Sequence, residues 1–181
     1  MTIQTGEDIL AADVLALGSG NDVNILSSLP PLSGLQAAPL SVGESSGAGT
    51  TKPIIPILSF DDTTDEGRMW IFRAPSTTLY LHYAGYMAGA NTSKTVCIAV
   101  QIAAVSPGDT GVTAKVFATV NTEIKTVPDA AGTQFDDTIT LTNGDSVAVG
   151  DWVCMTVFRD VSADDAAGDF NMNLINIQVS A

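Results

Sequence analysis

The residues of this sequence that could do chemistry are one histidine and several pairs of adjacent carboxylates. His82 is the only histidine, and it lies in the run Leu79–Tyr83. A hydrolytic triad would require this histidine beside an activated serine or cysteine and an orienting acid. The nucleophile elbow of hydrolases stands on a strand–turn–helix unit, and the sequence predicts no helix after residue 17. We therefore expect His82 to lie on a strand face without a catalytic role.

Adjacent carboxylates occur at four places: Asp61-Asp62, Asp65-Glu66, Asp136-Asp137 and Asp164-Asp165. Glycoside hydrolysis needs two carboxyl groups that face each other across a cleft, and adjacency in sequence does not provide this geometry. These pairs fall at predicted loops and strand ends, where solvated acids are common. We expect no catalytic residues, no cofactor and no enzymatic activity.

Four aspartates lie close together near the end of the sequence: Asp160, Asp164, Asp165 and Asp169. Calcium prefers such hard oxygen ligands, but the spacing does not fit the twelve-residue calcium loop. An alternative use is an ion pair with Arg159 or Arg73, because a guanidinium can hold a carboxylate by two hydrogen bonds. We expect the ion pair and predict no metal site.

Aromatic residues could form a platform for sugar rings, and six of them are candidates: Trp70, Phe72, Tyr80, Tyr83, Tyr86 and Trp152. Alternation along a strand sends many of these rings inward, and only 6% of the chain is aromatic. We expect most of the six to pack in a core. Cys97 and Cys154 lie in apolar strand-like runs, which favours buried free thiols over a disulfide.

The net charge is −13, from 20 acidic and 7 basic residues. Nucleic-acid binding depends on Lys and Arg, so nucleic acid and anionic membrane surfaces are poor partners. The N-terminus lacks the basic and apolar regions of a signal peptide, and we expect no export by that route.

The elements that must position these residues are strands. From Pro53 onward the sequence alternates with a period of 2, and β-branched residues dominate. The predicted strands cover residues 54–60, 69–74, 78–87, 95–105, 112–120, 135–142, 152–159 and 169–179. Eight strands without βαβ alternation predict an all-β fold, an antiparallel β-sandwich of jelly-roll type over residues 53–181.

Residues 1–52 are predicted to form an N-terminal arm, in which residues 18–51 are rich in Gly, Ser, Pro and Leu. Leu10, Val14 and Leu17 repeat on one face after a capping sequence, which predicts a short helix at about residues 6–17 and then an extended segment. The leucines favour an arm that becomes ordered on another surface, although an ordinary disordered linker is the alternative. The expected partner-binding residues are Ile9, Leu10, Val14, Leu17, Leu26, Leu29, Leu32 and Leu35.

Three stretches carry a resemblance to a known family: residues 57–66 leading into 69–75, Gly150-Asp151-Trp152, and Phe158-Arg159-Asp160 followed by 166–169. They resemble a jelly-roll family of tailed-bacteriophage structural proteins, especially capsid decoration (cement) proteins and some tail proteins. Residues 5–14 also resemble the start of phage appendage proteins. The resemblance implies a virion protein on the capsid exterior, often a trimer, that bridges neighbouring major capsid proteins.

The first hypothesis is therefore a homotrimeric capsid decoration protein, made in the host cytoplasm, whose partner is the major capsid protein. Binding the assembled lattice in preference to free subunits would stabilise the shell by mass action. The alternative hypothesis is a tail or fibre module that binds host surface glycans through an aromatic face.

Overall fold

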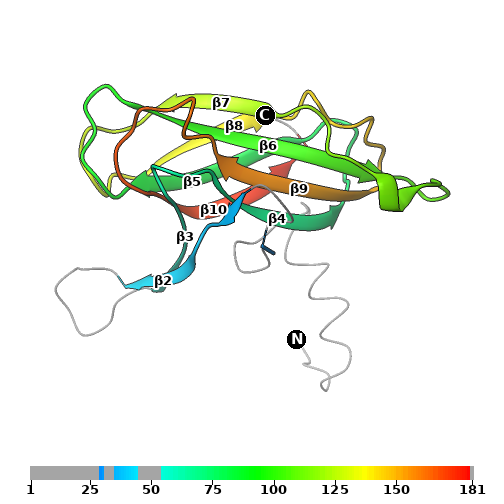
Figure 1. Ribbon diagram of the computed structural model, residues 1–181, viewed down its shortest axis with the longest axis horizontal. Coiled ribbons are helices and arrows are strands. Elements are labelled where there is room, and N and C mark those ends of the chain that lie inside the picture. The colour runs from blue at the N-terminus through cyan, green and yellow to red at the C-terminus, as the bar shows by residue number, and fades with distance from the viewer. Residues whose placement is uncertain (1–28, 31–34, 45–53, 180–181) are drawn as a thin grey trace, which may run out of the picture.

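The computed structural model describes residues 29–30, 35–44 and 54–179, and these ranges form a two-layered β-sandwich (Figure 1). The strands are β1 (Gln36–Ala37), β2 (Leu40–Glu44), β3 (Ile54–Phe60), β4 (Glu66–Arg73), β5 (Tyr80–Met87), β6 (Thr95–Val105), β7 (Asn121–Thr126), β8 (Phe135–Thr140), β9 (Trp152–Arg159) and β10 (Phe170–Gln178). No helix within these ranges is long and apolar enough to cross a bilayer.

The strand order identifies the jelly roll. The first sheet has the order β1-β4-β9-β6-β7, and the second sheet has the order β2-β3-β10-β5-β8. Among the eight strands from β3 to β10, the first pairs with the last, the second with the second-last, and so on inward: β3 with β10, β4 with β9, β5 with β8 and β6 with β7. All four pairs are antiparallel, as in a hairpin of four strand pairs rolled into two sheets. The predicted fold class is confirmed.

The core lies between the sheets and is built by alternation along the strands. In β5, Leu81 and Tyr83 are buried, and in β10 their direct partners Ile177 and Ile175 are buried too. The ring of Phe170 packs against three other buried rings, those of Phe60, Tyr83 and Phe135, at centroid distances of 6.2, 6.0 and 5.5 Å. Each fully buried large apolar side chain contributes about 1.5–3 kcal/mol relative to exposure.

Seven of the eight predicted strands are present, three with the predicted bounds (54–60, 95–105 and 152–159) and four with shifted ends, but the strand predicted at 112–120 is wrong. Gly111 has a φ of 77°, and residues Val112–Ala114 form a 3-10 turn instead. The side chain of Val116 is 76% exposed. Alternation makes a strand only where a neighbour supplies hydrogen bonds in register, and β6 pairs with the polar segment Asn121–Thr126 instead.

The described part of the predicted arm lies on the sandwich of its own chain. β1 pairs with β4 in parallel and β2 pairs antiparallel with β3, so residues 36–44 add one strand to the edge of each sheet. The Arg68 side chain donates to the Ala38 carbonyl oxygen at 2.6 Å. The predicted helix at 6–17 lies outside the described residues. So do six of the eight expected partner-binding residues: Ile9, Leu10, Val14, Leu17, Leu26 and Leu32.

Two of the expected arm contacts are described. Leu29 exchanges two backbone hydrogen bonds with Met69 of β4, of 2.7 and 2.9 Å, and its side chain is 43% exposed. Leu35 is half-buried, and its Cδ1 lies 3.0 Å from the position that a Cβ on Gly67 would take. Leu35 therefore packs where β4 has no side chain, while Leu29 stays partly exposed.

Candidate functional site

The outward face of the second sheet carries a polar surface with two tyrosines, which we name the amide–tyrosine face. It consists of Tyr80, His82 and Tyr86 of β5, Asn171, Asn173, Asn176 and Gln178 of β10, and Asp136, Thr138 and Thr140 of β8. All of these side chains are half-buried or exposed. The β5 side chains point outward because Leu81 and Tyr83, the odd-numbered residues between them, point into the core. In β10 a bulge between Met172 and Leu174 shifts the outward positions, so the exposed Leu174 lies on this face as well.

Side-chain hydrogen bonds link the strands across this face. Gln134 and Asn173 exchange two amide hydrogen bonds of 3.0 and 2.9 Å. β5 lies between β10 and β8, so this amide pair crosses over β5, at the level where the outward residue is the small Ala84. His82 Nε2 lies 3.3 Å from Asp136 Oδ2. The face therefore carries an ordered set of amide and carboxylate groups.

Unused hydrogen-bonding capacity remains at the centre of the amide–tyrosine face. His82 and Asn176 are direct cross-strand partners. His82 Nδ1 and Asn176 Oδ1 are each buried without a hydrogen-bond partner among the described residues. Polar atoms in this state are uncommon, because each loses its hydration without compensation. The His82–Asn176 pair is therefore a part of this face whose hydrogen bonds are incomplete.

The six candidate aromatic residues divide between the core and the outer faces of the two sheets. Trp70, Phe72 and Tyr83 are buried between the sheets, as expected for core packing. Tyr80, Tyr86 and Trp152 instead point outward, so the expectation fails for these three. The missed signal was local, because the apolar residues of the run Leu79–Tyr83 occupy odd positions and leave even positions to the outer face.

The outward face of the first sheet holds an apolar groove, which we name the Trp152 groove. Its volume is about 240 Å³, and it is lined by Ile71, Ala103, Val105, Val112, Lys115, Phe117, Trp152, Val153 and Cys154. The side chains of Trp152 and Ile71 are 50% and 54% exposed. The Arg73 guanidinium lies 4.6 Å from the Trp152 ring centroid, and Lys115 pairs with Asp145 at 2.9 Å. With few polar atoms in its lining, this groove suits an apolar group.

Both cysteines are free thiols, as predicted. Cys97 is buried, and its burial raises the pKa of the thiol from 9.0 to about 11. Cys154 is only half-buried, which corrects the expectation that both are buried, and burial raises the pKa of this thiol as well. Neither thiol is poised as a nucleophile, because the reactive form is the thiolate.

The predicted pairing of Arg159 with the aspartate loop is confirmed. Arg159 is 0% exposed and binds both carboxylate oxygens of Asp164, at 2.7 and 3.1 Å. Asp165 accepts a hydrogen bond from the Thr95 backbone at 2.8 Å and pairs with Lys94. Arg73 does not join this loop and instead donates to the Gly150 carbonyl oxygen at 3.0 Å.

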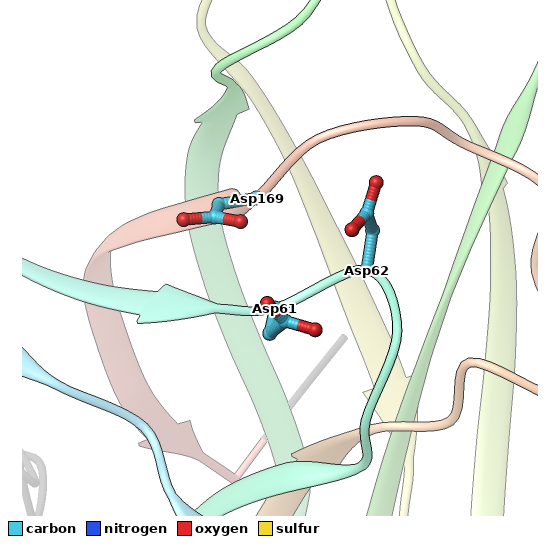
Figure 2. A group of neighbouring side chains, drawn as sticks. All are labelled: Asp61, Asp62 and Asp169. Atoms are coloured by element: carbon cyan, nitrogen blue, oxygen red, sulfur yellow. The ribbon is translucent and has the colours of Figure 1, made fainter.

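Asp169, the fourth aspartate of that loop, lies beside two acids more than one hundred residues earlier in the sequence. Figure 2 shows Asp169 beside Asp61 and Asp62, and one oxygen from each of the three lies within 4.8 Å of the others. Asp62 accepts the Gly168 N–H at 2.6 Å, while the hydroxyl and backbone N–H of Thr63 lower the pKa of Asp61. The cluster offers the oxygen ligands that a hard cation takes, but local donors already serve two of its members.

In each of the remaining carboxylate pairs, the two side chains point to different partners. Asp136 points outward to His82, whereas its neighbour Asp137 points to Lys125 at 3.2 Å. Asp65 accepts the Val161 N–H at 3.0 Å, and Glu66 accepts the Asp61 N–H at 2.9 Å. None of these pairs faces across a cleft.

Comparisons with known proteins identify no family for this chain. No family model matches the sequence, and no curated protein matches it. Among solved structures, the chain is similar to a family 16 carbohydrate-binding module (TM-score 0.40, 20% identity, 78% of this chain and 86% of that one). It is also similar to CBM28, a module specific for non-crystalline cellulose (0.46, 12%, 81% and 84%). A third similar structure is the enzymatically active domain of bacteriophage CBA120 tailspike protein 4 (0.45, 10%, 85% and 19%).

Proposed function

We propose that this protein binds carbohydrate through the amide–tyrosine face and acts as a binding module without catalysis. The observation that carries the proposal is the outward row of Tyr80, His82 and Tyr86 on β5, flanked by amides on β10 and by hydroxyls and a carboxylate on β8. A sugar presents apolar C–H faces together with many hydroxyl groups. Tyrosine rings can pack on the C–H faces, and amides can form hydrogen bonds with the hydroxyl groups.

The Trp152 groove supports this function less well. Its lining is almost entirely apolar, and Lys115 is already paired with Asp145. A sugar placed there would lose water from its hydroxyl groups without enough replacement hydrogen bonds. The amide–tyrosine face meets both needs of a sugar in one place.

The test is binding of the full chain to a glycan array, followed by titration calorimetry with the best ligand. We expect Tyr86→Ala and Asn176→Ala to weaken binding about tenfold, near one lost ring or amide contact. The matched control is Trp152→Ala, which removes an exposed aromatic ring from the other sheet and should leave affinity unchanged. If Trp152→Ala abolishes binding while Tyr86→Ala does not, the amide–tyrosine face is not the site.

The second candidate function is capsid decoration, which the Trp152 groove and the exposed Leu29 favour. An apolar groove with half-exposed Trp152 and Ile71 resembles the centre of a protein interface more than ordinary surface. A decoration protein should co-sediment with shells of its major capsid protein, and Ile71→Ser should weaken that association. Unchanged co-sedimentation of Ile71→Ser would remove the groove from this hypothesis.

A further inference from the structure

We infer that the ligand of the amide–tyrosine face is an uncharged polysaccharide, bound as an extended chain along β5. The inference rests on the proposed function and goes beyond it in stating the length and charge of the ligand. Three observations carry it: the spacing of the two tyrosines, the groups that lie between them, and the distribution of charge between the two sheets.

The spacing of the tyrosines sets the length of the ligand. Tyr80 and Tyr86 lie six positions apart on one strand and point to the same side. At a rise of about 3.3 Å per residue, their Cα atoms are roughly 20 Å apart. A monosaccharide or disaccharide cannot reach both rings. A ligand that uses both must be an oligosaccharide of several units lying lengthwise.

Polar groups continue between the two rings. His82 and Asn176 lie on neighbouring strands near Tyr80, and the Gln134–Asn173 amide pair crosses β5 near Tyr86. Each of those two amides keeps one N–H and further lone-pair capacity for a ligand. A chain along β5 would therefore meet hydrogen-bonding groups near both rings, with the apolar Ala84 and Leu174 on the face between them.

The charge of this face disfavours an anionic ligand. Lys52 lies outside the described residues, and the other six cations are Arg68, Arg73, Lys94, Lys115, Lys125 and Arg159. Every one of these six belongs to the first sheet or to a loop that adjoins it. The amide–tyrosine face instead carries the exposed carboxylate of Asp136, in a chain of net charge −13. Uronate or sulfate groups would be repelled there without a compensating cation.

The experiment compares ligands that differ in one property at a time. Titration calorimetry with neutral β-linked oligosaccharides from two to six units measures the length dependence. Affinity electrophoresis in gels that contain a neutral glucan, mannan or xylan, or an alginate or pectate, measures the charge preference. We expect affinity for at least one neutral series to rise about tenfold or more from the dimer to the hexamer. We expect no retardation by the acidic polymers.

Variants assign the length dependence to the two rings. Tyr80→Ala and Tyr86→Ala should each reduce hexamer affinity about tenfold. At least one of the two substitutions should leave dimer affinity within about twofold of the parent value. Tyr86→Phe keeps the ring and should bind like the parent protein, which separates loss of stacking from misfolding. Thermal unfolding of each variant controls for the fold.

Three outcomes separate the two claims. Equal affinity for dimer and hexamer overturns the extended mode, and preferential retardation by alginate or pectate overturns the neutral class. In both cases carbohydrate binding itself would stand. Absence of binding to every glycan overturns the proposed function together with this inference.

Discussion

At the scale of single residues, the buried Arg159 holds the loop between β9 and β10. Besides its two bonds to Asp164, it donates to the carbonyl oxygens of Phe60, Ala166 and Gly168, at 3.3, 2.6 and 2.8 Å. These contacts use its five N–H donors on one carboxylate and three backbone oxygens. The guanidinium thereby fixes the chain between two strands that lie in different sheets.

Removing the partner of this guanidinium should destabilise the protein strongly. Asp164→Ala leaves a buried cation without its counter-charge, and we expect a loss of about 3–5 kcal/mol in the free energy of unfolding. Urea denaturation followed by tryptophan fluorescence measures it. Asp165→Ala is the control, because Asp165 pairs with Lys94 at the surface and its loss should matter far less. Equal effects of the two substitutions would contradict the role assigned to Arg159.

Cys97 should be chemically silent while the protein is folded. Burial holds its thiol pKa at about 11, so almost no thiolate exists at pH 8. A raised pKa means that the folded state disfavours the thiolate. The stability that comes from burying the neutral thiol is complete below pH 9 and is lost as pH rises towards 11. We expect Ellman's reagent at pH 8 to modify Cys97 only after unfolding. A rapid reaction of Cys97 in the native protein, located by peptide mass spectrometry, would be inconsistent with the burial described.

Sequence reasoning succeeded for residues whose partners are near in the chain. Arg159 and Asp164 are five positions apart, and their pairing could be predicted from residue chemistry alone. The meeting of Asp169 with Asp61 and Asp62 could not, because it depends on the pairing of β3 with β10, more than one hundred residues apart. The outward positions of Tyr80 and Tyr86 were also predictable, since they follow from the alternation along β5.

At the scale of elements, β5 and β10 approach each other closely at Gly85. A Cβ on Gly85 would stand 2.5 Å from the Asn171 carbonyl oxygen and 2.6 Å from a Phe170 ring atom. Neither neighbour can give way easily, because one is backbone and the other is the central ring of the core. Glycine is therefore required for these strands to pair in this register.

Gly85→Ala should separate β5 from β10 and destabilise the fold by about 1–3 kcal/mol or more. Differential scanning calorimetry would show this as a lower melting temperature. Gly144→Ala makes a suitable control, since a Cβ there meets its nearest atoms at 3.5 Å and the backbone needs no left-handed conformation. A melting temperature unchanged by Gly85→Ala would mean that the sheet can relax more than its packing indicates.

The failed strand at 112–120 shows the limit of periodicity. The alternation of Val112, Val116 and their neighbours is as regular as that of the true strands, yet Val112 and Val116 are exposed. The segment that does pair, Asn121–Thr126, has Ile124 as its single large apolar residue, and that side chain is exposed. A strand at a sheet edge is selected by available backbone partners, which a single sequence does not reveal.

At the scale of the whole molecule, residues 36–44 cover one edge of each sheet. β1 covers part of β4, and β2 covers β3 over five residue pairs. An uncovered strand edge presents unpaired N–H and C=O groups that invite pairing with another chain. These short strands therefore belong to the stability of the sandwich, whatever the preceding residues bind.

Two truncations should behave differently for this reason. Removal of residues 1–28 leaves β1 and β2 in place and should change the melting temperature little. Removal of residues 1–52 exposes the edges of β3 and β4, and we expect a lower melting temperature and concentration-dependent association. Size-exclusion chromatography with light scattering distinguishes the two. A monomer of unchanged stability without residues 1–52 would show that the edges need no cover.

The fold class was predictable because eight alternating segments without helices leave few architectures. The order of strands was not predictable from periodicity, since the same segments could form other sandwiches. It follows from pairings between distant segments, from β3 with β10 inward to β6 with β7. The candidate binding face depends on this order, because β10, β5 and β8 are neighbours only through it.

The position of β10 has a consequence for biosynthesis. Residues 170–178 leave the ribosome after every other described strand, yet they form a central strand of the second sheet, between β3 and β5. Until they emerge, β3 and β5 have no shared neighbour and Phe170 is missing from the core. The sandwich must therefore remain incompletely folded until these residues emerge, and a holding chaperone would find its apolar segments exposed until then.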